Sequence, residues 1–162
     1  MIKSSPYDAM SLCYSLLIGK SKYATDMKKG EVWYRSMSEK YPDNVGFAMG
    51  YGNILWCNAS YDEAIKMYEK AIQLKPDLIN AYASIAITYE YKRTNIAKAN
   101  QYAKKILELV PQNPYADFVL ARNIQDIDQK ISKLKEISQI HPEYTRITNE
   151  IGICYGATKK DY

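Results

Sequence analysis

Glycine, proline and histidine are scarce in this chain of 162 residues, which contains 7 glycines, 6 prolines and 1 histidine. Few glycines and widely spaced prolines favour long helices over strands joined by tight turns. A single histidine excludes zinc motifs that use two histidines, and the 3 cysteines form no Cys-x-x-Cys pair. These scarcities predict an all-α protein without a metal or redox centre.

Long apolar runs and blocks of like charge are also missing. No stretch approaches the roughly 20 apolar residues of a membrane span, and no amino-terminal stretch reads as a signal peptide. The net charge of +4 is spread along the chain, whereas a nucleic-acid binder usually shows a dense basic stripe. We therefore expect a cytoplasmic protein, unless a targeting segment is absent from this sequence, with no membrane contact and no preference for nucleic acid.

No group of residues is typical of catalysis. Gly19-Lys20-Ser21 resembles the end of a phosphate-binding loop, but Tyr14 stands where that motif needs its first glycine. His141 precedes Pro142 and has no triad or metal partner nearby in the sequence, so it reads as a solvated turn residue. We expect no enzymatic activity and no cofactor.

Prolines and small residues are instead regularly spaced along the chain. Prolines recur at intervals of 34, 35 and 31 residues, at Pro42, Pro76, Pro111 and Pro142. Ten residues after each proline stands a small residue, in order Gly52, Ala86, Ala121 and Gly152. Two features that keep one register through four units indicate a true internal repeat, and the small residues would let neighbouring helices approach closely.

Each repeat reads as two helices. Residues 60–75 place apolar side chains at steps of three and four, which defines one helix face: Ala64, Ile65, Tyr68, Ala71 and Ile72. Ser60 and Glu63 match a capping box that would start this helix, and Pro76 would end it. Asn113-Pro114 likewise marks a helix start. In the unit that closes at Pro142, we expect a turn between the helices that is about three residues short.

These residues resemble the tetratricopeptide repeat. The segment from Val45 to Leu78 matches that family's pattern nearly throughout, with Tyr51-Gly52, Leu55, Ala64, Tyr68, Ala71 and Pro76. The next segment departs from the pattern at Ala103 and Ile106, and both ends of the chain are more irregular. The resemblance implies an all-α fold, a right-handed α-solenoid of antiparallel helix pairs, with units at about 5–42, 43–76, 77–111 and 112–142 and a partial unit at 143–162 in a single domain 1–162.

The resemblance also implies a protein–protein interaction scaffold that holds a peptide or helix of a partner in a concave groove. In that family the groove is lined by the first helices of successive units. The register gives eight candidate residues: Met49, Asn53, Trp56, Asn80, Ile87, Tyr115, Phe118 and Arg122. Asparagine can bind a partner's backbone through donor and acceptor atoms, and aromatic residues and arginine often anchor interfaces. The alternative is that the apolar members simply pack between units. A clamp for chaperone tails is not favoured, because Met49, Tyr115 and Val119 stand where it needs polar or positive groups.

Two other functions fit the same sequence. The last unit stops at Tyr162 after its first helix, so the chain is either a fragment, as the apolar Ile151 and Ile153 suggest, or ends in a single capping helix. A fragment would suit a helical accessory or regulatory region of a larger enzyme or sensor. An RNA-binding helical repeat is less favoured by the charge pattern. The partner's identity and the oligomeric state stay open.

Overall fold

The structure is a computed structural model that describes residues 24–92 and 95–158, with side chains described for 28–92 and 95–157. Every regular element in these ranges is an α-helix. The eight helices in chain order are α2 (Ala24–Lys40), α3 (Val45–Cys57), α4 (Tyr61–Leu74), α5 (Ile79–Lys92), α6 (Ile96–Leu109), α7 (Pro114–Arg122), α8 (Ile127–Ile140) and α9 (Thr145–Thr158). The all-α prediction is confirmed, while the first half of the predicted unit at 5–42 lies outside the described residues.

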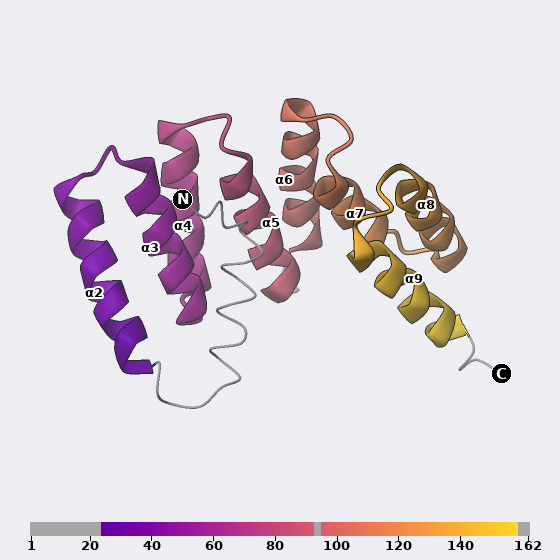
Figure 1. Cartoon of the computed structure of the whole chain (residues 1–162), viewed down its shortest axis with the longest axis horizontal. Helices are drawn as coiled ribbons and strands as arrows, with labels where there is room; N and C mark the ends of the chain where they lie inside the picture. The colour runs from indigo at the N-terminus through magenta and orange to yellow at the C-terminus, as the bar shows by residue number, and fades with distance from the viewer. Residues whose placement is uncertain (1–23, 93–94, 159–162) are drawn as a thin grey trace.

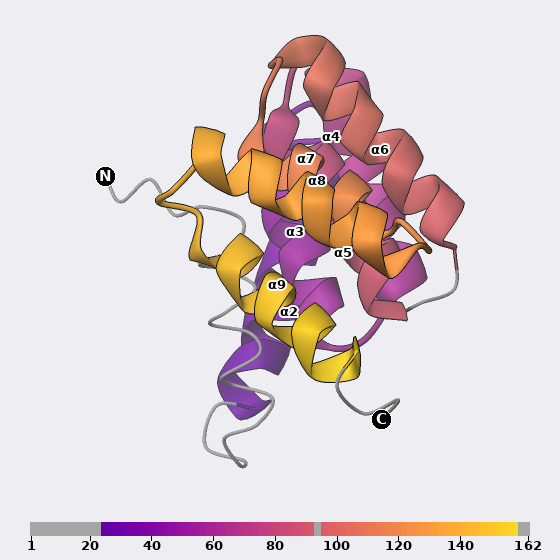
Figure 2. The same ribbon diagram turned by 90° about the vertical axis from the view of Figure 1, so that its right-hand side faces the viewer.

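The helices form an array in which each one packs against the next along the chain. Figure 1 shows them side by side in sequence order, from α2 at one end to α8 and α9 at the other. In Figure 2, which turns the C-terminal end toward the viewer, α8 and α9 lie in front and α2 lies far behind them. This is an open solenoid of helix pairs, with α3 and α4, α5 and α6, and α7 and α8 as successive pairs.

The starts of the helices depend on local hydrogen bonds that the sequence predicts only in part. The Asn113 side-chain oxygen accepts hydrogen bonds from the backbone N–H groups of Tyr115 and Ala116, at 3.1 and 3.2 Å, so α7 begins as expected. Ser60 does precede α4, but its side chain makes no capping hydrogen bond. The capping-box prediction is therefore wrong in its chemistry, although the helix boundary is right.

In the unit that closes at Pro142, the first helix is short, whereas the turn between the helices is not. Helix α7 has 9 residues, compared with 13 in α3 and 14 in α5. The connection from α7 to α8 runs over residues 123–126, which is no shorter than the connection at 58–60. The cap at Asn123, whose N–H bonds back to the Ala121 and Val119 carbonyls, ends α7 early.

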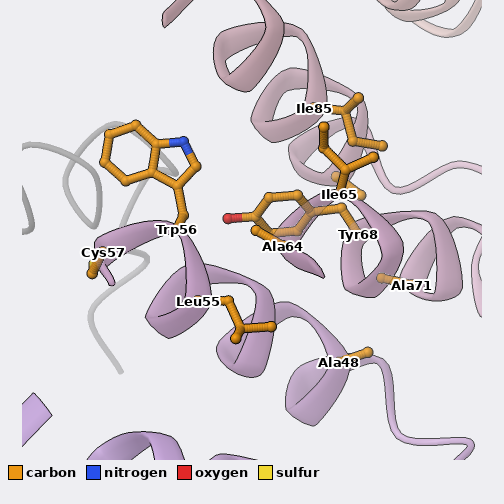
Figure 3. Packing of buried hydrophobic residues seen from close by; sticks show 10 residues of the cluster. Ala48, Leu55, Trp56, Cys57, Ala64, Ile65, Tyr68, Ala71 and Ile85 are labelled. Carbon is orange, nitrogen blue, oxygen red and sulfur yellow. The ribbon is translucent and has the colours of Figure 1, made fainter. Parts of the chain in front are cut away.

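Three clusters of buried apolar residues make up the core, each shared by consecutive helices. In the first cluster, Figure 3 shows the ring of Tyr68 on α4 extending toward the helix that carries Leu55 and Trp56, while Ile65 lies beside Ile85 of α5. Gly52 has a defined role there, because a Cβ at this position would lie 2.6 Å from Cε1 of the Tyr68 ring. The small residue therefore lets the fully buried tyrosine lie directly against α3.

Candidate partner-binding face

The eight candidate residues lie on α3, α5 and α7, the first helices of successive pairs. We call the surface of α3, α5, α7 and α9 the first-helix face. Side chains join its neighbouring helices directly: the rings of Trp56 and Tyr91 lie 5.4 Å apart, and the Tyr115 hydroxyl donates to the Ala83 carbonyl at 3.3 Å. The repeat therefore brings residues from three units onto one face.

The three aromatic candidates are buried. Trp56, Tyr115 and Phe118 are only 3, 5 and 4% exposed. Trp56 packs edge-on against Tyr61, Phe118 packs edge-on against Tyr144, and burial raises the pKa of Tyr115. The expectation that these rings face a partner is corrected, because in this structure they fill the spaces between helices.

The remaining candidates differ in how much of each side chain is accessible. Asn80 is exposed, and the Arg122 side chain is 41% exposed. Asn53 is half-buried, with its side-chain oxygen accepting a hydrogen bond from the Tyr68 hydroxyl at 3.0 Å. Met49 and Ile87 are half-buried against the core clusters. Asn80 and Arg122 are therefore the candidates best placed to contact a partner.

Arg122 lies between two glutamates from neighbouring first helices. Its guanidinium nitrogens are 3.6 Å from carboxylate oxygens of Glu90 on α5 and Glu150 on α9. The glutamate side chains are only 12 and 15% exposed, whereas the Arg122 side chain is 41% exposed. Burial raises the pKa of Glu90, and the positive charges of Arg122 and Arg146 partly oppose that rise.

The guanidinium retains hydrogen-bonding capacity. Both contacts exceed the 2.7–3.2 Å typical of N–H···O hydrogen bonds. Within the part of the chain that the structure describes, Arg122 donates no hydrogen bond, so its N–H groups can turn to an acceptor on a partner. Sequence reasoning found Arg122 but missed Glu150. The repeat register does not bring the two residues together, because Arg122 lies eleven residues after Pro111 and Glu150 lies eight residues after Pro142.

His141 differs from its predicted state. It caps the C-terminal end of α8, and its side chain is only 16% exposed, so it is not a solvated turn residue. Its Nδ1 lies 3.6 Å from a Glu143 carboxylate oxygen. The described residues contain no group of three or more histidine, cysteine, aspartate or glutamate side chains placed to hold a metal ion. Nor is any described helix both long and apolar enough to cross a membrane.

A comparison with protein families matches part of the chain. A family model described as TPR repeat matches residues 52–92, the region that includes α4 and α5. Together with the array of helix pairs, this match shows that the chain is similar to tetratricopeptide repeat proteins over this region. The match supports, in general terms, a protein–protein interaction scaffold.

Several individual proteins are similar to it. Tetratricopeptide repeat protein 8 of Caenorhabditis elegans is 28% identical over 81 residues, which cover 50% of this chain and 16% of that protein. The BBSome complex member BBS4 homolog of Drosophila melanogaster is 25% identical over 104 residues, which cover 62% of this chain and 21% of that protein. The chain thus spans about a fifth of the length of these relatives.

Two solved structures share the fold. YrrB, described as a TPR protein with an unusual peptide-binding site, superimposes with a TM-score of 0.61 over 94% of this chain and 77% of its own, at 17% identity. MamA superimposes with a TM-score of 0.64 over 87% of this chain and 86% of its own, also at 17% identity. At this level of identity the likeness concerns the fold alone.

Proposed function

We propose that this protein binds a peptide or helix of a partner protein across its first-helix face, in a groove that runs past α3, α5, α7 and α9. The observation that carries the proposal is the position of Arg122. It lies over two glutamates from the neighbouring first helices, and its N–H donors are not used within the described residues. We further propose that residues 1–162 act as one array with the unit boundaries given above.

The chemistry of the face suits an extended partner segment. Asn80 offers both a donor and an acceptor to a peptide backbone, and Arg122 offers donors about one repeat further along the array. The half-buried Met49 and Ile87 add apolar surface between the polar positions. Alternating apolar and hydrogen-bonding groups can hold a backbone and select side chains at the same time.

Two substitutions that add the same charge test the proposal, one on a first helix of a repeat and one on a second helix. Asn80→Arg would crowd the first-helix face, whereas Gln101→Arg adds the same charge at an exposed position on α6. In affinity capture with the tagged full chain, we expect Asn80→Arg to lose a partner that Gln101→Arg retains. Equal recovery of every captured protein by both variants and the unmodified chain would contradict the proposal.

A second candidate function is an accessory or regulatory region within a longer protein. It is favoured by the comparison in which the chain matches only about a fifth of each curated relative. In that case the first-helix face would bind another segment of the same protein. The full reading frame of the parent gene tests this directly, since a frame that ends at Tyr162 would exclude a following domain.

A further inference from the structure

A cluster of three tyrosines fills the angle between α4, α5 and α6. The rings of Tyr82 and Tyr89, both on α5, lie 6.3 and 6.2 Å from the ring of Tyr102 on α6. The Tyr102 hydroxyl donates to a Glu69 carboxylate oxygen on α4 at 3.1 Å, and the Tyr82 hydroxyl donates to the Pro76 carbonyl at 2.9 Å. Phenol rings with satisfied hydroxyl groups therefore occupy this site.

The same positions in the next repeat carry quite different side chains. Counted from the closing prolines, Glu69, Tyr82, Tyr89 and Tyr102 correspond to Lys104, Asp117, Ile124 and Lys133. No aromatic residue stands at any of these four positions. The angle between α6, α7 and α8 should therefore be unfilled where the preceding one is packed.

The structure has a cavity at that place. Its volume is about 590 Å³, and its lining includes all four of these residues. This volume lies within the range of about 300–1,000 Å³ that is usual for ligand pockets. Leu120 and Ile124 supply apolar surface, while Lys104 from α6 and residues of α8 form the sides. The cavity lies between the second helices α6 and α8 and is separate from the Arg122 site.

Two lysines line the cavity, and only one of them has an ion-pair partner among the described residues. The Lys133 ammonium is paired with Glu136 at 2.8 Å. Lys104 is exposed and forms no ion pair within the described residues, so its positive charge is available. Asp117 is half-buried, and burial raises the pKa of its carboxyl group against the opposing effects of His141 and Lys133. The cavity thus offers an apolar surface, a carboxylate that can accept a hydrogen bond and a cation that can pair with an acid.

We propose that this cavity binds a tyrosine side chain of a partner protein that stands next to an acidic residue. The ring packs on Leu120 and Ile124, as the chain's own tyrosines pack one repeat earlier. The phenol hydroxyl donates to Asp117, and the neighbouring acid pairs with Lys104, which replaces the acidic Glu69 of the filled site. The site goes beyond the first-helix face and does not depend on it.

The test uses short capped peptides and the full-length protein. The acetylated, amidated peptide Gly-Glu-Tyr-Gly is titrated into ¹⁵N-labelled protein, and amide chemical shifts are followed. We expect a Kd of about 1 mM, which is typical of so small a ligand, with shift changes confined to residues around the cavity. Replacing the peptide's tyrosine by alanine, or its glutamate by lysine, should weaken binding at least fivefold.

Two variants of the protein test the site itself. Lys104→Glu introduces an acidic residue, as Glu69 is at the equivalent position of the preceding repeat. It should weaken binding at least fivefold while leaving the fold unchanged. The double variant Ile124→Tyr and Lys133→Tyr refills the cavity and should abolish binding. Arg122→Gln, on the other face, should bind the peptide normally.

Three results would overturn the proposed site or the choice of tyrosine as its ligand. Shift changes away from the cavity, or equal binding by Lys104→Glu and the unmodified protein, would overturn the site. Equal binding of a peptide with phenylalanine in place of tyrosine would overturn the hydrogen bond to Asp117 and the choice of tyrosine. Because Lys104 is exposed, its substitution tests the proposal even where the refilled variant does not fold.

Discussion

Two glycines at equivalent repeat positions, Gly52 and Gly152, should respond in opposite ways to the same change to alanine. At Gly52 the new Cβ would lie 2.6, 2.8 and 3.2 Å from the Cε1, Cδ1 and Cζ atoms of Tyr68. Carbon atoms normally pack at about 3.5–4.0 Å, so roughly 1 Å of movement is needed. Tyr68 is fully buried and its hydroxyl bonds to Asn53, so the ring cannot move freely.

The magnitudes follow from two opposing effects. Overpacking a buried site costs about 1–3 kcal/mol, while replacing glycine by alanine within a helix contributes about 1 kcal/mol of stability. Gly52→Ala should therefore lower the free energy of unfolding by up to about 2 kcal/mol. At Gly152 a Cβ meets nothing within 4 Å, so Gly152→Ala should raise it by about 1 kcal/mol.

The assay is urea unfolding of both variants and the unmodified chain, followed by far-UV circular dichroism. Because the helix-propensity gain is common to both changes, the difference between the variants isolates the overpacking at Tyr68, about 1–3 kcal/mol in favour of Gly152→Ala. Equal stability of the two variants would refute the close approach of Tyr68 to α3.

Three further predictions concern capping, charge and the core. Asn113→Ala should cost about 0.5–2 kcal/mol in urea unfolding, because Asn113 caps α7, whereas Ser60→Ala should cost much less, since Ser60 makes no capping bond. The raised pKa of Glu90 means that the native state binds its proton more tightly than the unfolded chain does, so this residue's contribution to stability falls as pH rises from the ordinary glutamate pKa through the raised one. Glu90→Gln should remove that part of the pH dependence of the melting temperature; an unchanged profile would contradict it. Ile106→Ala, at a fully buried site, should lower the free energy of unfolding by about 2–5 kcal/mol, and a loss below 1 kcal/mol would place Ile106 outside the core.

The fold could be predicted because it depends on the spacing of residues along the chain, which the sequence shows directly. Prolines and small residues recur in one register, and apolar residues follow the helical period, so the helix pairs and the role of Gly52 were accessible without coordinates. Local chemistry was less accessible. Asp62 and Lys66 stand four residues apart with the acid first, the order that favours an ion pair on a helix, but in the structure Asp62 pairs with Lys92 of α5 at 2.7 Å. Nothing in the spacing distinguishes those two partners.

The contacts on the candidate partner-binding face were also not predictable from residue spacing. Repeat register placed Trp56, Tyr115 and Phe118 on the first helices correctly, but it could not show which side chains neighbouring units would bury. That depends on how closely α3, α5 and α7 approach one another. Polar residues were the better guide, since Asn80 and Arg122 stay accessible while the rings turn inward.

The measurement that tests the central claim most directly is site-specific photo-crosslinking. A benzophenone amino acid replaces Asn80 on the first-helix face in one sample and Gln101 on α6 in another, both at exposed positions. In an extract of the cells that make the protein, we predict that position 80 forms a discrete covalent adduct with a partner protein that position 101 does not capture. The same adduct from both positions, or from position 101 alone, would contradict binding across the first-helix face.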